Sequence, residues 1–300
     1  MMARALPATT LLLVALLAGT ARAQVTEFAT NSANVTSAST TGSISLNLAS
    51  LSGSNNTLLV GVSIVGLSST TPTVSSIKWN GTALTPECSV QESASSSNYV
   101  SVAIWALQNP SAISNTVSIT LSGSTVFQAG AVVFTNVQSV GTCQTATTRG
   151  GLNVSSTSVS VTTPGAGGAV FDTLAVESIV AAGSLTMTPT AGQTSLWNVV
   201  DTSPPPGGAN CQSGGCSAGG AGSYAGNVST MSYSFPGPTL SNTAYGAIPL
   251  TATPSIKRKG QTIVGALSKP HRPNNAEDNG YRSNITTRRQ PDRFHDRRRS

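Results

Sequence analysis

Short runs of alternating apolar and small polar residues, each ended by Gly, Pro or Asn, recur throughout residues 24–254. A period of two residues is typical of β-strands, and no window of this region has the 3.6-residue period of an amphipathic helix. In residues 98–107, NYVSVAIWAL, both alternating sets of side chains are largely apolar, which predicts an inner strand. The pattern predicts an all-β fold, an antiparallel β-sandwich of jelly-roll or immunoglobulin-like type with about twelve strands.

Turn signals divide this region further. Asn80-Gly81 lies between two extended runs, and this dipeptide favours a type I′ hairpin because both turn positions need a positive φ. Residues 202–227 are so rich in Gly and Pro that we expect one long exposed loop there. No other linker divides the region, so residues 24–255 are predicted to form a single β-sandwich domain.

The two ends of the chain have different compositions. Residues 1–23 combine an early Arg, an apolar run and the small-x-small triplet Ala21-Arg22-Ala23, which predicts a secretory signal peptide cleaved before Gln24. No stretch is long and apolar enough to predict a membrane span. Residues 256–300 are rich in charge and poor in apolar residues, which predicts a disordered basic tail. We therefore expect a secreted protein, extracellular or on a cell surface.

Charge is divided unequally between these parts. Residues 24–255 hold two basic and six acidic residues, a formal net charge of −4, whereas residues 256–300 hold twelve basic and four acidic residues, a net charge of +8. One hypothesis is that the tail binds an acidic polymer such as an anionic polysaccharide, a wall polymer or extracellular DNA. The alternatives are a solvated tail, a processed propeptide or an extension that is not native.

Four cysteines remain after cleavage, and an even number in an oxidising compartment predicts two disulfides. Three pairings exist. The least demanding joins Cys211 to Cys216 within one loop and Cys88 to Cys143. A zinc site is disfavoured because the spacing from Cys211 to Cys216 differs from that of zinc-binding cysteine pairs.

Several phrases occur together in a familiar order: NTLLVGVSI, VSSIKWNGTALT, VSVAIWALQNPSAISNTVSITLSG, AGAVVFTNV, TAGQTSLWNVV and STMSYSF with AYGAIPLTA. In this order they resemble a family of secreted bacterial β-sandwich surface modules. The resemblance covers most of residues 45–252, and its motifs are structural. It implies an immunoglobulin-like or jelly-roll sandwich of largely uncharacterised role and implies no catalytic residue, because a fold alone does not carry a function.

Few residues offer catalytic chemistry. Residues 24–255 contain no histidine, and His271 and His295 lie in the predicted disordered tail, where no fixed catalytic geometry is expected. A glycosidase needs two facing carboxylates. The candidates are Glu87, Glu92, Asp172, Glu177 and Asp201. We expect Asp172 and Glu177 on opposite faces of one strand, and Asp201 and Glu92 in loops. No catalytic residue, metal ligand or cofactor is predicted. Calcium binding stays an open question because extracellular sandwiches often bind calcium through loop carboxylates and carbonyls, although no EF-hand-like run occurs.

Aromatic rings could form a platform for stacking against sugars. The candidates are Trp79, Trp105, Trp197, Tyr99 and Tyr224. Trp79 is the best candidate for exposure because it adjoins the hairpin turn, and the predicted ligand-binding set is Trp79, Tyr99 and Tyr224. In a eukaryotic host, N-x-S/T sequons would mark glycosylated surface positions. Within the domain they are Asn34, Asn55, Asn80, Asn153 and Asn227, and a sixth, Asn284, lies in the tail.

Three functions are consistent with these features. The first is a non-enzymatic structural or adhesive protein that self-associates, for example as a filament subunit, through its early extended segment, because edge strands with few charges pair easily. The second is a glycan-binding module. The third is a carboxylate-dependent glycoside hydrolase.

Overall fold

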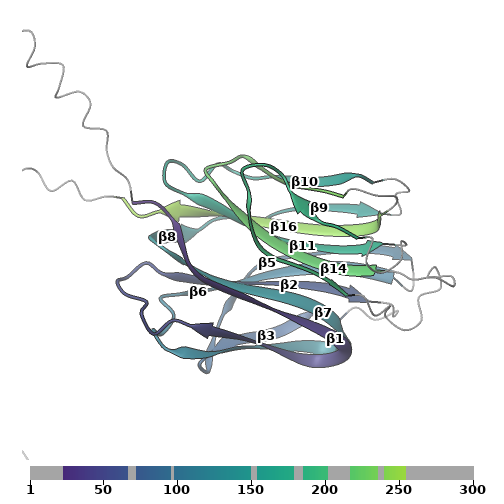
Figure 1. Ribbon diagram of the computed structural model, residues 1–300, viewed down its shortest axis with the longest axis horizontal. Coiled ribbons are helices and arrows are strands. Elements are labelled where there is room, and N and C mark those ends of the chain that lie inside the picture. Colours follow the sequence, from purple (N-terminus) through teal and green to yellow (C-terminus); the bar gives the residue numbers. More distant parts are fainter. Residues whose placement is uncertain are drawn as a thin grey trace, which may run out of the picture. The chain divides into compact units, whose positions relative to one another are not determined.

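The computed structural model (Figure 1) describes residues 23–66, 72–95, 98–149, 154–178, 185–201, 217–235 and 240–254. Within these ranges the chain forms strands and no helix, which confirms the predicted all-β class. The predicted signal peptide up to residue 22, the tail 256–300, Cys211, Cys216 and Asn153 lie outside the described residues. The strands are β1 (Thr26–Asn47), β2 (Thr57–Gly66), β3 (Val74–Trp79), β4 (Thr82–Ala83), β5 (Thr85–Ser95), β6 (Asn98–Gln108), β7 (Ser114–Thr135), β8 (Val137–Val140), β9 (Gln144–Arg149), β10 (Ser156–Ser160), β11 (Ala169–Ser178), β12 (Thr188–Pro189), β13 (Thr194–Asp201), β14 (Ser217–Gly226), β15 (Thr230–Ser234) and β16 (Leu240–Ala252).

These strands form three antiparallel sheets. The first has the order β4-β3-β7-β2-β6-β5, with β1 also paired to β7. The second has the order β13-β14-β11-β16-β8, with β9 also paired to β16, and the third has the order β10-β15-β12. Strand β6 lies between β2 and β5, which confirms the predicted inner strand.

The first sheet folds over on itself along β1 and β7. Residues 125–135 of β7 pair with β2 and with the first half of β1, whereas residues 114–121 pair with β3 and with the second half of β1. The two halves of the sheet therefore face each other and enclose an apolar core that includes Ile44, Leu58, Val60, Ile77 and Phe127. This arrangement is a β-sandwich, as predicted.

The chain repeats one topology twice. We call residues 25–136 the N-repeat and residues 137–252 the C-repeat. In the N-repeat β2 lies between β6 and β7, and in the C-repeat β11 lies between β14 and β16. Strand β5 pairs with β6 as β13 pairs with β14, and β3 pairs with the first half of β7 as β12 pairs with β15. Strand β1 corresponds to β8, β9 and β10 together.

Reciprocal hydrogen bonds join the two repeats. The backbone N–H of Val25 donates to the carbonyl of Gly167 at 2.8 Å, and the N–H of Val137 donates to the carbonyl of Asn55 at 2.8 Å. Asn55 and Gly167 both precede the central strand of their repeat by two residues, and both have positive φ, 64° and 79°. The first residue of each repeat is thus hydrogen-bonded to the equivalent residue of the other repeat, the one two positions before its central strand.

A shared irregularity supports this equivalence. The register of β5 against β6 shifts between Pro86 and Cys88, and that of β13 against β14 shifts between Ser195 and Trp197. A β-bulge, which places one extra residue in one strand, occurs at the same point of both pairs. Pro86 is therefore the counterpart of Ser195, and Cys88 is the counterpart of Trp197.

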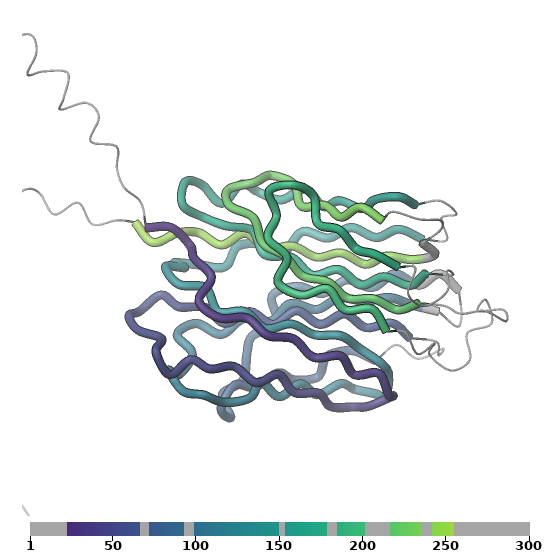
Figure 2. Tube along the Cα trace, viewed as in Figure 1, coloured from purple at the N-terminus to yellow at the C-terminus, as the bar shows by residue number. Residues whose placement is uncertain are grey.

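The repeats pack sheet against sheet through a continuous apolar layer. Leu59, Val132 and Phe134 of the N-repeat belong to the same buried cluster as Phe171 and Ile248 of the C-repeat. Both central strands are buried along their whole length because each has sheets on both faces. The ends of the described chain, purple and yellow in Figure 2, lie side by side.

A disulfide adds a covalent link between the repeats. Cys88 on β5 is bonded to Cys143, between β8 and β9, with 5.3 Å between the two Cα atoms. This confirms one of the two predicted bridges. The second predicted bridge, which joins Cys211 to Cys216, lies outside the described residues.

The predicted turn at Asn80-Gly81 is confirmed, whereas the predicted loop over residues 202–227 is wrong for its last part. Asn80 and Gly81 have φ values of 48° and 78° and join β3 to β4. Residues 217–226, SAGGAGSYAG, form the buried strand β14 between β11 and β13. Small residues are required there because Trp197 packs directly on the strand: a Cβ at Gly222 would lie 2.1 Å from its indole ring. Glycine in a strand commonly marks such a close approach.

Candidate functional site

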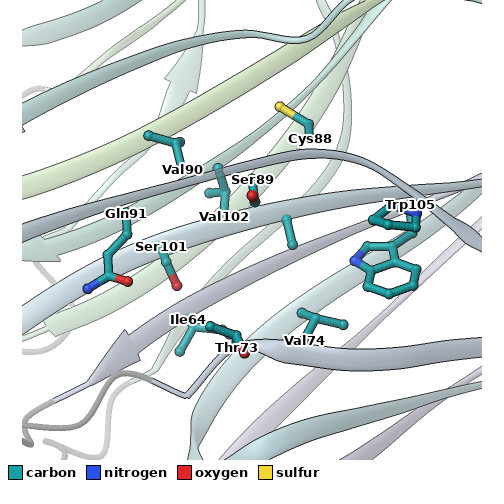
Figure 3. Close-up of a pocket in the computed structure, with 12 residues that line it drawn as sticks. Ile64, Thr73, Val74, Cys88, Ser89, Val90, Gln91, Ser101, Val102 and Trp105 are labelled. Carbon is teal, nitrogen blue, oxygen red and sulfur yellow. The ribbon is translucent and has the colours of Figure 1, made fainter.

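A cleft in the N-repeat is large enough for a small ligand. Its volume is about 420 Å³, within the range of about 300–1,000 Å³ that is common for small-molecule sites. It lies between the start of β3 and the face formed by β2, β5 and β6 (Figure 3). It is lined by Ile64, Thr73, Val74, Pro86, Cys88, Ser89, Val90, Gln91, Ser101, Val102, Ala103 and Trp105.

The cleft follows from the alternation of side chains along β6. Val100, Val102 and Ile104 are buried against the C-repeat, so the opposite set of side chains faces away from it. In that set Ser101 and Trp105 are partly exposed. The aromatic ring and the hydroxyl therefore come to the surface because the other face of the strand is occupied.

The lining combines one aromatic ring with uncharged hydrogen-bonding groups. In Figure 3, Gln91 and Ser101 lie at one end of the cleft and the indole of Trp105 lies at the other. Ser89 and Thr73 add two hydroxyl groups, and none of the described lining residues carries a charge. Such a surface suits an uncharged polar molecule that also has an apolar face.

Among the described residues of the C-repeat, side chains occupy the space that corresponds to the cleft. Gly219 is the counterpart of Ser101 by strand register. A Cβ at Gly219 would lie 2.8 Å from Met187 Cε and 3.0 Å from Leu185 Cδ2. The side-chain amide of Asn198 also donates to the carbonyl of Met187 and holds this segment in place.

The expectation that Trp79 is exposed is wrong. Its side chain is 0 % exposed, and its indole N–H donates to the carbonyl and the hydroxyl of Ser111 at 3.2 and 3.0 Å. Tyr99, also predicted as a ligand contact, is 2 % exposed in the same core. Both rings point into the sandwich because their strand faces are the inner ones, and neither offers a face for stacking.

Tyr224 is partly exposed but lies away from the cleft. Its ring packs edge-on against Phe134 at a centroid distance of 5.2 Å. Trp197 is buried between the repeats. Of the five candidate rings, only Trp105 reaches the cleft. The sequence places it on one face of an inner strand, but both faces look apolar, so no signal in the sequence separates it from the core rings.

The five candidate carboxylates do not line the cleft. Asp172, Glu177 and Asp201 are all buried, so no substrate reaches them in this structure. Asp201 ends strand β13 and Glu92 lies within β5, which corrects the prediction that both lie in loops. Glu87 follows Pro86 in the bulge of β5, and partial burial raises the pKa of its carboxyl above the ordinary value.

Other predicted features can be placed on the structure. Asn34, Asn55, Asn80 and Asn227 have exposed side chains, as glycan acceptors require. Over the described ranges, no group of three or more His, Cys, Asp or Glu side chains is placed to hold a metal ion. No helix in the described part of the chain is long and apolar enough to cross a bilayer.

No protein-family model matches the sequence, and no curated protein or solved structure shows significant similarity to it. The resemblance to secreted bacterial β-sandwich modules therefore stays a prediction.

Proposed function

We propose that this protein is an extracellular, non-enzymatic adhesive module that binds a neutral glycan in the cleft beside Trp105. The observation that carries the proposal is the cleft itself, with its ring, its hydroxyl and amide groups, and its lack of charged lining residues. A sugar ring has an apolar face of C–H groups that packs on an indole, and hydroxyls that pair with Ser, Thr and Gln.

Two further features support an extracellular, non-catalytic role. The predicted signal peptide and the disulfide Cys88–Cys143 both suit an oxidising compartment. Hydrolysis of a glycoside needs two carboxyl groups about 5–10 Å apart around the bond that is cleaved. The cleft offers none among its lining residues, so a bound glycan would be held without turnover.

Self-association by strand exchange has less support. The early extended segment is β1, and it pairs with β7 of its own chain from Thr26 to Asn47. A donated β1 would have to give up this pairing first. The only exposed large hydrophobic side chain among the described residues is Ile113, so no apolar patch on the described surface favours a second copy.

Binding of the full chain to an array of neutral and acidic oligosaccharides, followed by calorimetry on the best ligand, tests the proposal. We expect a neutral glycan to bind, and Trp105→Ala to weaken it by about tenfold or more because the stacking surface is lost. Trp105→Phe should retain part of the affinity. Tyr224→Phe, outside the cleft, is the matched control and should bind as the wild type does. Binding of acidic glycans alone, or equal affinity of the Trp105→Ala protein, would contradict the proposal.

A further inference from the structure

A buried carboxylate lies at the centre of the C-repeat. Asp172, on the central strand β11, is 0 % exposed and points into the core between the second and third sheets. A charged carboxylate loses its hydration when it is buried and needs compensating partners. The groups around Asp172 therefore determine which protonation state the fold prefers.

Five hydrogen-bond donors converge on this side chain. The backbone N–H and the hydroxyl of Ser223 donate to it at 2.6 and 2.9 Å. The hydroxyls of Tyr245 and Tyr233 donate at 2.7 and 3.2 Å, and the amide of Gln193 lies at 3.4 Å. We call Asp172 and these four donor residues the Asp172 cluster. It joins β11, β14 and β16 of the second sheet to β15 of the third sheet.

The partners of Asp172 are all uncharged. The titratable groups that face it are the phenols of Tyr233 and Tyr245, whose rings pack edge to face with centroids 5.6 Å apart. Glu177 lies an odd number of residues along β11 and so belongs to its other face. On β9 it is Ala146, and not Arg149, that lies opposite Tyr245. None of these described neighbours brings a positive charge to the carboxylate.

Burial without a cation has a predictable effect on the acid. It raises the pKa of Asp172 from 3.8 to about 7, although hydrogen bonds from Tyr245, Ser223 and Tyr233 oppose the change. Burial, and then the charge of Asp172, raise the pKa of both tyrosines well above 10, so the phenols stay protonated. Asp172 therefore changes its charge near neutral pH.

The fold itself does not require this polar centre. By strand register, the N-repeat has Val60 in place of Asp172, Ala129 in place of Tyr245 and Val117 in place of Tyr233. All three belong to the apolar core of the N-repeat. The same topology thus closes with an apolar centre in one repeat and an ionisable one in the other.

We propose that the Asp172 cluster is a proton-sensitive contact between the two sheets of the C-repeat. It stabilises the folded state more when Asp172 is protonated than when it is ionised. In the unfolded chain the carboxyl ionises near its ordinary pKa, which favours unfolding as the pH rises. The contribution of Asp172 to stability is therefore complete below about pH 4. It decreases as the pH rises toward 7 and is level above that.

Two measurements on the full chain with its disulfides intact test this inference. The first is the ¹³Cγ chemical shift of Asp172 as a function of pH, which we expect to titrate with a midpoint near 7. Tyr245→Phe removes a donor to the carboxylate and should raise this midpoint further. Tyr99→Phe removes a buried phenol from the N-repeat and should leave it unchanged. A midpoint at or below about 4, the ordinary value for Asp, would overturn the inference.

The second measurement is urea unfolding at pH 5 and pH 8. We expect the unfolding equilibrium constant of the wild type to increase between these pH values by at least about tenfold more than that of Asp172→Asn, which cannot ionise. Identical pH profiles for the two proteins would contradict the proposal. If the variant fails to fold, the chemical-shift titration of the wild type decides the question alone.

Discussion

The N-repeat and the C-repeat place the same strands in the same order but use the space between their sheets differently. The N-repeat has an apolar centre and leaves a cleft beside Trp105. The C-repeat fills the matching groove with Leu185 and Met187 and places the ionisable Asp172 at its centre. By strand register Ser223, a partner of Asp172, occupies the position of Trp105.

This difference shows which features the topology itself requires. The bulge on the edge strand, the positive φ before the central strand and the reciprocal hydrogen bonds occur in both repeats. The cleft and the buried carboxylate occur in one repeat each. The shared features therefore maintain the fold, and the unshared ones are the places where function is expected.

The largest effect is expected when the ionisable residue at the centre of the C-repeat is placed at the corresponding position of the N-repeat. Val60→Asp would place a carboxylate in the N-repeat core, where Val117 and Ala129 stand in place of the tyrosines. We expect the free energy of unfolding to decrease by more than about 4 kcal/mol at pH 8, measured by urea denaturation. Val60→Ala, which only leaves a small cavity, is the control and should cost about 2 kcal/mol. A tolerated Val60→Asp would show that the two centres are interchangeable.

Removing the covalent link between the repeats should have the next largest effect. The double variant Cys88→Ala with Cys143→Ala opens a loop of 55 residues, and we expect a loss of about 4 kcal/mol. Thermal unfolding against the oxidised wild type measures it. An unchanged midpoint would mean that the packing between the repeats constrains the chain without the disulfide.

A smaller effect is expected at one of the close contacts between the repeats. A Cβ at Gly130 would lie 2.1 Å from the ring of Trp197, so Gly130→Ala should cost about 2 kcal/mol by overpacking. Gly226→Ala is the matched control in a strand, because nothing lies within 4 Å of its Cβ position. Combining Gly130→Ala with Trp197→Phe should recover part of the loss. Equal stability of the Gly130→Ala and Gly226→Ala proteins would argue against this close contact.

The parts of the fold that were predictable from the sequence are those set by local patterns. The alternation in β6, the Asn80-Gly81 turn and the pairing of Cys88 with Cys143 were predicted correctly. Strand β14 was not, because its glycines look like a loop in the sequence. The reason for them lies in side chains from other strands, such as Trp197 against Gly222 and Ser63 against Gly220.

The duplication and the cleft were hidden for a related reason. Equivalent positions hold different residues, such as Val60 and Asp172, so the repeat is visible in the strand pairing and not in the amino-acid sequence. Trp79 ends a strand in which Ile77 and Trp79 alternate with the exposed Lys78, whereas Trp105 lies in a strand with two largely apolar faces. The folding of the first sheet over itself buries the ring of Trp79 and leaves that of Trp105 at a cleft. Exposure depends here on contacts between strands far apart in the sequence.

The most direct test of the central claim, that the cleft of the N-repeat is the binding site, is to map a bound neutral oligosaccharide by NMR. Indole N–H signals would be assigned with Trp105→Phe, and chemical shifts followed during titration of the full chain. We predict changes at Trp105 and at the amides of Gln91 and Ser101, with Gly219 and Asn198 of the C-repeat unaffected. Changes centred on the C-repeat, or saturable binding with no change at Trp105, would contradict the account.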